Sequence, residues 1–96
     1  MLNSKQKKYL KGLGHNVDAS LLIGKSGIST NTCEELDRQL AARELVKVKF
    51  NEFKEEKKNL AADLASKTDS TLVQIIGNNA LFYREAVKDS QISLPQ

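Results

Sequence analysis

The sequence is poor in the residues that form disulfides, metal centres and aromatic stacking surfaces. Its 96 residues include one cysteine, one histidine, no tryptophan, two tyrosines and three phenylalanines. The lone Cys33 cannot form an internal disulfide and is typical of a reducing cytoplasm, and one cysteine with one histidine cannot supply the usual ligands of zinc. We therefore expect no metal site, no cofactor and a cytoplasmic location. His15 could stack on a base or contact a phosphate, but a solvated loop position is the simpler expectation. Tyr9 is the aromatic residue best placed to stack on a base, but packing is its simpler role.

Long apolar runs are also missing. None approaches the ~20 residues needed to span a membrane, and the lysines near the start are not followed by the apolar core of a secretory signal. No nucleophile stands with a base at a recognisable spacing, and no Walker lysine motif is present. We expect a monomeric domain over residues 1–96 with no catalytic residues, no membrane contact and no small-molecule substrate. A small enzyme is the poorest hypothesis.

Positive charge is concentrated in the first third of the chain. The formal net charge is only +3, from 15 basic and 12 acidic residues. Residues 1–33 hold five of the lysines and a single acid, Asp18, which is a net charge of +4; residues 34–96 hold the other ten basic and eleven acidic residues, a net charge of −1. Such an asymmetry indicates a polyanionic partner, although a lysine-rich solvated helix face would explain it too.

A glycine loop follows the first apolar run. Residues 21–23 indicate a buried strand, and Gly24-Lys25-Ser26-Gly27 comes directly after it. The two glycines lack a Cβ and allow a sharp turn close to a bulky group. Lys25 adds a positive charge and Ser26 a hydroxyl, and a helix start beyond the loop directs backbone N–H groups towards an anion. We interpret the loop as a clamp for a nucleic-acid backbone, although the tetrad alone is more often a plain strand-to-helix turn.

Hydrophobic periodicity predicts three helices and four strands in the order α-β-α-β-α-β-β. Helices between the first three strands favour parallel neighbours, and turn residues at 77–79 predict a closing antiparallel hairpin. The fold class is therefore α/β, a four-stranded mixed sheet packed with three helices. The most apolar run, 72–76, is expected to be a central strand, and residues 86–96 a loose tail apart from 92–95. The expected elements are 3–13, 21–23, 30–43, 45–50, 54–67, 72–76 and 80–84.

The expected first helix carries lysines and no acid. Lys7 and Lys11 lie one turn apart, and nothing on the helix neutralises their repulsion. The strand at 45–50 alternates, so Lys47 and Lys49 point away from its apolar face. Such residues extend a basic surface, or they are ordinary solvated faces. The candidate residues outside the glycine loop are Lys5, Lys7, Lys8, Lys11, Lys47 and Lys49.

Several segments together make a more specific pattern than the glycine loop does. The segments are Gln6-Lys7-Lys8-Tyr9-Leu10-Lys11-Gly12-Leu13 with His15, Ile23-Gly24-Lys25-Ser26-Gly27-Ile28-Ser29, Glu44-Leu45-Val46-Lys47-Val48-Lys49, Val73-Gln74-Ile75-Ile76-Gly77, Leu81-Phe82-Tyr83-Arg84 and Ile92-Ser93-Leu94-Pro95. In their order and spacing these segments resemble the YhbY-like CRM domain (chloroplast RNA splicing and ribosome maturation) over nearly the whole chain.

The resemblance implies an RNA-binding domain, with a fold similar to the C-terminal domain of bacterial initiation factor three and a loop likened to that of KH domains. The stand-alone bacterial form is associated with precursors of the large ribosomal subunit, and related plant domains serve intron splicing. By position, residues 24–27 would contact RNA, and the first-helix lysines would flank them. Two departures stand out. Asp18-Ala19 replaces a frequent Lys-Pro and subtracts from the basic surface, and Ile28-Ser29 is a mild change from Leu-Thr.

The leading hypothesis is a non-enzymatic protein that binds ribosomal RNA or large-subunit precursors through the glycine loop and the basic first helix. We expect it to contact phosphates with little sequence choice and to recognise the shape of the RNA. The alternative is a protein-interaction module whose basic patch docks an acidic partner. The leading mechanism requires the first-helix lysines and residues 24–27 to lie side by side as one cradle.

Overall fold

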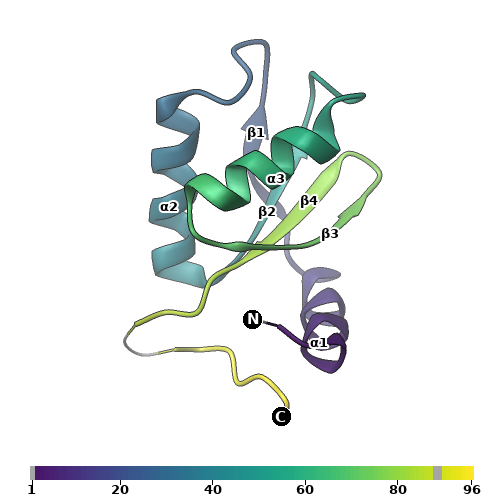
Figure 1. The fold of residues 1–96 in the computed structure, drawn as a ribbon, viewed down its shortest axis with the longest axis vertical. Coiled ribbons are helices and arrows are strands. Elements are labelled where there is room, and N and C mark those ends of the chain that lie inside the picture. The colour runs from purple at the N-terminus through teal and green to yellow at the C-terminus, as the bar shows by residue number, and fades with distance from the viewer. Residues whose placement is uncertain (1, 88–89) are drawn as a thin grey trace.

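The computed structural model describes residues 2–87 and 90–96, and these form three helices and four strands in the predicted order (Figure 1). No helix in the described part of the chain is long and apolar enough to cross a lipid bilayer. The elements are α1 (Ser4–Gly14), β1 (Ala19–Ile23), α2 (Thr30–Arg43), β2 (Leu45–Phe50), α3 (Lys57–Lys67), β3 (Thr71–Ile76) and β4 (Asn79–Tyr83).

The four strands form one mixed sheet in the spatial order β1-β2-β4-β3. β1 and β2 are parallel, whereas β4 pairs antiparallel with both β2 and β3. The mixed α/β sheet is as predicted, but the expectation that residues 72–76 form a central strand is wrong, because β3 pairs only with β4 and lies at an edge. Its apolar character has another cause: Leu72 and Ile75 pack into the core on one face of the sheet, and Val73 packs into a second core on the other.

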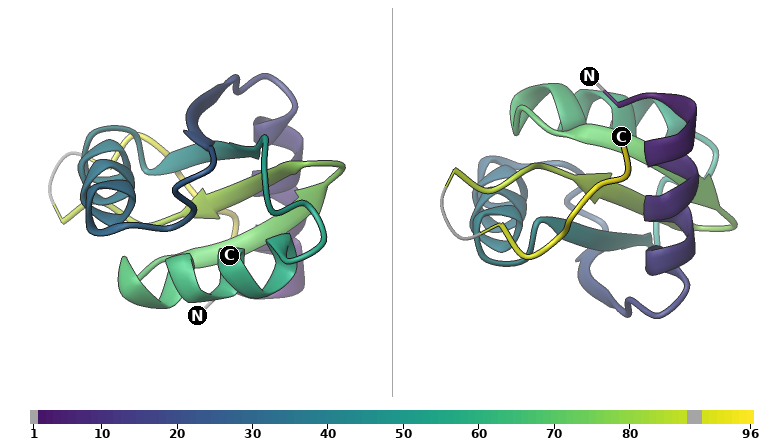
Figure 2. Two further views of the ribbon diagram at one scale, coloured as in Figure 1. Left: turned by 90° about the horizontal axis from the view of Figure 1, so that it is seen from above. Right: turned by 90° about the horizontal axis from the view of Figure 1, so that it is seen from below.

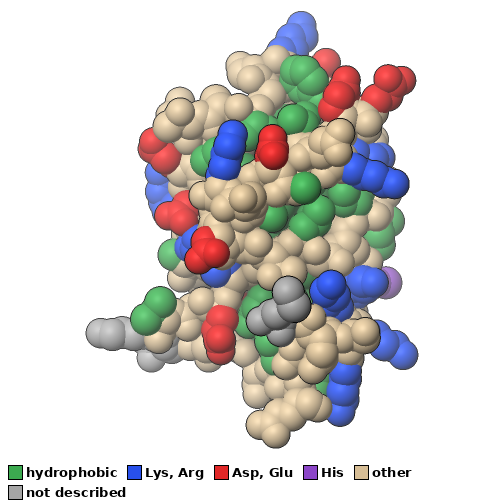
Figure 3. Space-filling model, in the orientation of Figure 1, with side chains coloured by type: hydrophobic (Ala, Val, Ile, Leu, Met, Phe, Trp, Pro, Cys, Tyr) green, Lys and Arg blue, Asp and Glu red, His purple; other side chains and the backbone are tan. Residues whose placement is uncertain are grey.

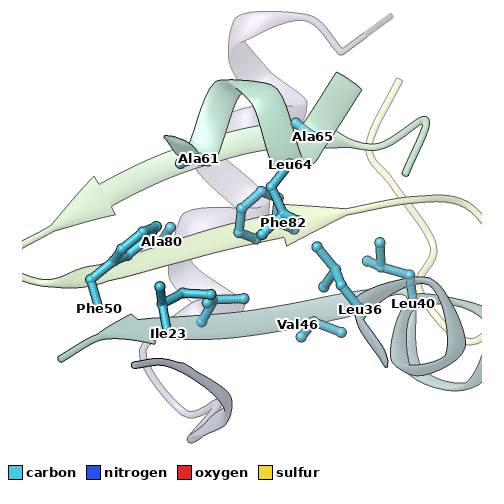
Figure 4. Close-up of a cluster of buried hydrophobic side chains, with 11 residues drawn as sticks. Ile23, Leu36, Leu40, Val46, Phe50, Ala61, Leu64, Ala65, Ala80 and Phe82 are labelled. Atoms are coloured by element: carbon cyan, nitrogen blue, oxygen red, sulfur yellow. The ribbon is translucent and has the colours of Figure 1, made fainter. Parts of the chain in front are cut away.

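The helices cover the two faces of the sheet unequally. Figure 2 shows α1 on one side of the strands and α2 on the other. The larger core lies between the sheet and the pair α2 and α3, and Figure 4 shows its members, which include Ile23, Leu36, Phe50, Leu64 and Phe82. The smaller core lies under α1 and consists of Leu10, Leu45, Val73, Leu81 and Tyr83. The sheet is therefore sandwiched, with only one helix on the α1 face.

Local capping explains where the first two helices begin. Asn3 and Gln6 have the spacing of a capping box and form one, in which each side chain accepts a hydrogen bond from the other's backbone N–H. In α2 the cap is Ser29, which is paired reciprocally with Thr32. Asn31-x-x-Glu34 and Thr32-x-x-Glu35 also have capping-box spacing, but the serine directly after the glycine loop is the cap.

The turns before α3 and between β3 and β4 depend on left-handed backbone. α3 begins at Lys57, three residues later than predicted, since Phe53 has a φ of 57° and Glu56 makes no side-chain cap hydrogen bond. The β3–β4 hairpin pairs Ile76 with Asn79 across two turn residues, and Gly77 is the first of them, with a φ of 57°. A glycine at this position is typical of the tight hairpin turns that match the twist of a sheet.

The C-terminal segment is held against the sheet, in contrast to the predicted loose tail. Glu44, which is only 2% exposed, accepts hydrogen bonds from Ala86 N, Ser90 Oγ, Gln91 N and Ile92 N. Burial alone would raise the pKa of the Glu44 carboxyl, but these four hydrogen bonds outweigh it and hold the pKa below its ordinary value. Farther along, Ile92 and Leu94 pack against the smaller core. The described part of residues 86–96 is therefore ordered by one buried carboxylate and two apolar contacts.

Candidate nucleic-acid interface

The lysines of α1 all point to solvent. Lys5, Lys7, Lys8 and Lys11 are exposed, and no residue of Ser4–Gly14 is acidic. The opposite side of the helix packs on the sheet through Leu10, and Gly14 approaches β4 so closely that an added Cβ would lie 2.6 Å from a methyl group of Leu81. This close packing of the last turn holds the helix against the sheet, so its four charges form a single-sign surface in a fixed position.

The two lysines of β2 lie on the same face of the sheet as α1 but differ in role. Lys47 is half buried, and its Nζ donates to the Gly14 carbonyl at 2.7 Å. This bond satisfies a carbonyl at the C-terminal end of α1, where a positive charge also complements the helix dipole. Lys49 is exposed. Lys47 therefore helps to hold α1 in place, and Lys49 is the freer of the two to meet a ligand.

The segment between β1 and α2, residues 24–29, is a separate feature that we call the tip. Gly27 N donates to Gly24 O at 3.0 Å, which closes the turn, and Gly27 has a φ of 66°. Lys25 and Ser26 are exposed at its apex. The first turn of α2 is less open to an anion than predicted, because the backbone N–H of Thr32 already donates to the Ser29 side chain.

The tip and α1 lie towards opposite ends of the molecule. In Figure 1 the longest axis is vertical, with the tip at the upper end and α1 at the lower end; the two end-on views of Figure 2 agree. That axis measures 39 Å. The expectation that the first-helix lysines and residues 24–27 form one cradle is therefore wrong, since β1 carries the chain along the sheet before the glycine loop begins. Any polyanion that contacts both must run along the molecule.

The neighbours of the tip are acidic. The segment between β2 and α3 folds against it: Asn51 N and Glu52 N both donate to Ile23 O, and a Cβ on Gly27 would lie 3.3 Å from the Phe53 ring. This segment carries Glu52, Glu55 and Glu56, all exposed, with Lys54 among them. Figure 3 shows the contrast, with acidic side chains near the upper end and lysines gathered at the lower right beside the single histidine. The charge excess found in the sequence thus belongs mainly to the α1 end.

A hollow beside the end of α1 was missed by the sequence reasoning. It has a volume of about 250 Å³ and is lined by Gly14, His15, Lys47, Gln74, Ile76, Asn79 and Leu81. These residues come from four separate segments, so no local pattern could have grouped them; the only signal was the alternation of Gln74 and Ile76 along β3. His15, exposed at the C-terminal cap of α1, has a place at this wall.

Among the described residues, no group of three or more histidine, cysteine, aspartate or glutamate side chains is arranged to hold a metal ion. The chemistry on offer at the α1 end is therefore that of lysine ammonium groups, amides and backbone. These groups bind oxygen atoms of an anion and donate or accept hydrogen bonds.

The fold and the α1 end define a class: a small mixed α/β domain with one helix-borne basic surface. The CRS1 / YhbY (CRM) domain matches residues 2–84, and the chain belongs to this family. It is 38% identical over 96 residues to the "Probable RNA-binding protein YqeI" of Bacillus subtilis, and the match covers 99% of this chain and 100% of that protein. It is 32% identical over 96 residues to the "RNA-binding protein" of Haemophilus influenzae, covering 99% and 96%.

A solved structure has the same fold. The solution structure of the hypothetical protein SAV1595 from Staphylococcus aureus superimposes with a TM-score of 0.84 at 45% sequence identity, covering 99% of this chain and 100% of that chain. The predicted resemblance and the predicted fold class are thereby confirmed.

Proposed function

We propose that this protein binds RNA without catalysing a reaction, and that the surface of α1 is its main contact. The observation that carries the proposal is a helix with four exposed lysines and no acid, held in one position on the sheet by Gly14 and Lys47. Like charges on one helix destabilise it slightly, so a partner that neutralises them is a physical reason for their presence. The names of the relatives support RNA as that partner.

Binding of this kind depends on phosphate charge. Each lysine that neutralises a phosphate releases a condensed counterion, which makes affinity fall steeply as salt rises. Lys5, Lys7, Lys8, Lys11 and Lys49 would supply most of this term, with Lys47 supporting them. The tip, Gly24-Lys25-Ser26-Gly27, would form a second and weaker contact at the other end of the molecule. Phosphate contacts set position and carry no base sequence, so we expect broad sequence tolerance.

For the biological target we propose ribosomal RNA in precursors of the large subunit, in the cytoplasm. The family resemblance motivates this choice. Sedimentation of a cell extract followed by detection of the protein tests it. We expect the protein in fractions that contain immature large subunits, and its absence from all ribosomal fractions would contradict this target while leaving RNA binding itself open to direct assay.

The direct assay is a mobility shift with purified ribosomal RNA across a salt series. We expect wild-type affinity to fall steeply with salt. Reversal of two α1 charges, Lys7→Glu with Lys11→Glu, should lower the affinity about tenfold and reduce the salt slope by roughly two. The matched control is Lys58→Glu with Lys67→Glu, which makes the same charge change at two exposed positions of α3, on the other face of the sheet.

The two pairs separate local contact from overall charge. If both lower the affinity equally, net charge alone governs binding and α1 is not a specific surface. If neither pair matters, α1 is excluded. If wild-type protein does not bind RNA at all, the proposed function fails, and the alternative, docking to an acidic protein, becomes the better explanation of the same lysines.

A further inference from the structure

One row of the sheet is left uncovered on the α1 face. The strand register places Leu22, Lys49, Asn79 and Ile76 side by side across all four strands, from β1 to β3. Leu22 and Ile76 lie on the two edge strands and are each 57% exposed, so the row begins and ends with a large aliphatic side chain open to solvent. The adjacent part of this face is covered by α1 and the C-terminal segment, so the open row lies between α1 and the end of the sheet that leads into the tip.

The hollow adjoins this row. Ile76 and Asn79 belong to both, and Gln74 and Lys47 continue the hollow towards the last turn of α1. His15 completes its wall from the other side. Its volume of about 250 Å³ is below the ≈ 300 Å³ at which sites for drug-sized ligands begin. It therefore suits one small flat group rather than a whole ligand.

The chemistry of the row and the hollow differs from that of a phosphate site. Phosphate oxygens only accept hydrogen bonds, so lysines suffice for them. The amides of Gln74 and Asn79 both donate and accept, which is what the edge of a nucleobase requires. Exposed aliphatic side chains and an imidazole can pack on the flat face of a base, and Lys49 stands between them within reach of its phosphate. The residues that the register aligns in this row include no acid.

We propose that the open row and the hollow receive unpaired bases of the RNA whose backbone α1 holds, so that this protein prefers single-stranded RNA to a duplex. The inference rests on the proposed RNA binding. In an A-form duplex the base faces are stacked and the Watson–Crick edges are paired, so a duplex offers this surface phosphates, 2′-hydroxyl groups and the shallow minor-groove edges of the bases, but no base face. An unpaired segment offers both faces and edges, and it would follow the sheet from α1 towards the tip.

The experiment compares two probes, a fluorescent 16-nucleotide RNA of mixed sequence without self-complementarity and its blunt-ended duplex, by anisotropy at several salt concentrations. Wild-type protein should bind the single strand at least fivefold more tightly. Leu22→Ser with Ile76→Ser, and separately His15→Ala, should lower single-strand affinity about fivefold and leave duplex affinity and the salt slope unchanged. The matched control is Val87→Ser, a fully exposed aliphatic position in the C-terminal segment, which should change neither.

The outcomes distinguish the two levels of the proposal. Salt-dependent binding with equal affinity for both probes overturns the base-contacting site and leaves the RNA-binding function standing. Equal losses for both probes in the row variants overturn it as well, because they would report a general weakening. Failure of wild-type protein to bind either probe or ribosomal RNA overturns the function itself. A thermal melt of each variant, including His15→Ala at an exposed position, guards against a loss of fold.

Discussion

The α1 end and the tip differ in the groups that they expose to an anion. At the α1 end the charge is carried by side chains: four exposed lysines on one helix without an acid, followed by His15 and Lys49. At the tip the distinctive feature is backbone: a turn closed between Gly24 and Gly27, with a single lysine at its apex. The first is suited to long-range attraction of a polyanion, and the second to close approach at one point.

The difference extends to what supports each end. The tip packs on the acidic segment at 51–56, which follows β2 directly. The α1 end depends on the far end of the chain: Gln6 Nε2 donates to Pro95 O at 3.1 Å, and Leu94 packs in the same core as Leu10. We infer that the two ends can be altered independently, and four changes test that separation.

The largest effect is expected from Glu44→Gln. Each oxygen of this carboxylate accepts from two donors, so an amide would turn an NH₂ group towards two of those donors, at a side chain that is itself only 2% exposed. Leaving such groups unsatisfied costs about 3 kcal/mol in the free energy of unfolding, measured by urea titration. Hydrogen exchange should accelerate in α1 and not at the tip. Uniform acceleration in both would show that the ends are not independent; Glu34→Gln, at an exposed position of α2, is the control.

The same residue predicts a pH dependence. Because the folded-state pKa of Glu44 lies below that of an unfolded glutamate, about 4.3, its stabilisation is fully present above that value. It is lost as pH falls through the lower, folded-state pKa. Wild-type protein should therefore lose its advantage over Glu44→Gln in acid, and an advantage that persists unchanged to pH 2 would assign the stability to another group.

Short-range features of this fold follow from the local sequence, but its long-range features do not. The capping-box spacing of Asn3 and Gln6 and the alternation of 45–50 are short-range patterns, and the structure forms both. The placement of β3 at an edge and the separation of α1 from the tip are long-range outcomes. An apolar run looks the same whether strands flank it or helices cover it, and closeness in sequence between Lys11 and Lys25 does not bring them together in space.

The tip residues themselves show the same limit. Gly24 and Gly27 look equivalent in the sequence, yet of the two only Gly27 has a positive φ, and only on Gly27 would an added Cβ meet the Phe53 ring. Glu44 gave no local signal beyond a charge placed directly before an apolar strand, since its partners lie more than forty residues later. Contacts of this range depend on the assembled fold, which explains why α1's supports and the hollow were not predicted.

The second of the four changes concerns the backbone of the tip. Gly27→Ala should lower the free energy of unfolding by about 1–2 kcal/mol, because an L-residue disfavours a φ of 66° and its Cβ would press on the Phe53 ring. Gly24→Ala is the control, since nothing lies within 4 Å of its added Cβ. If α1 dominates binding, RNA affinity measured on the folded Gly27 variant should fall less than threefold. A tenfold fall would make the tip the main contact.

The third prediction uses the acids beside the tip. Glu52→Gln with Glu55→Gln removes two negative charges from the segment that packs against the tip, and it should raise RNA affinity about threefold at low salt if RNA reaches the tip. The gain should vanish at high salt, where exposed charges are screened. An unchanged affinity at low salt would confine RNA to the α1 end and the open row, and would remove residues 24–27 from the interface.

The smallest effect is a gain in stability. Lys7→Glu removes a like-charge pair and places a glutamate four residues before Lys11, the favourable orientation on a helix. It should raise the free energy of unfolding by about 0.4 kcal/mol, seen as a melting temperature higher by ~2–3 °C for a domain of this size. The same change should weaken RNA binding. A variant that is more stable but binds RNA less well would show that the α1 lysines serve RNA binding at the expense of helix stability. A variant that is less stable would contradict this, because it would show that the α1 lysines do not destabilise the helix by repulsion.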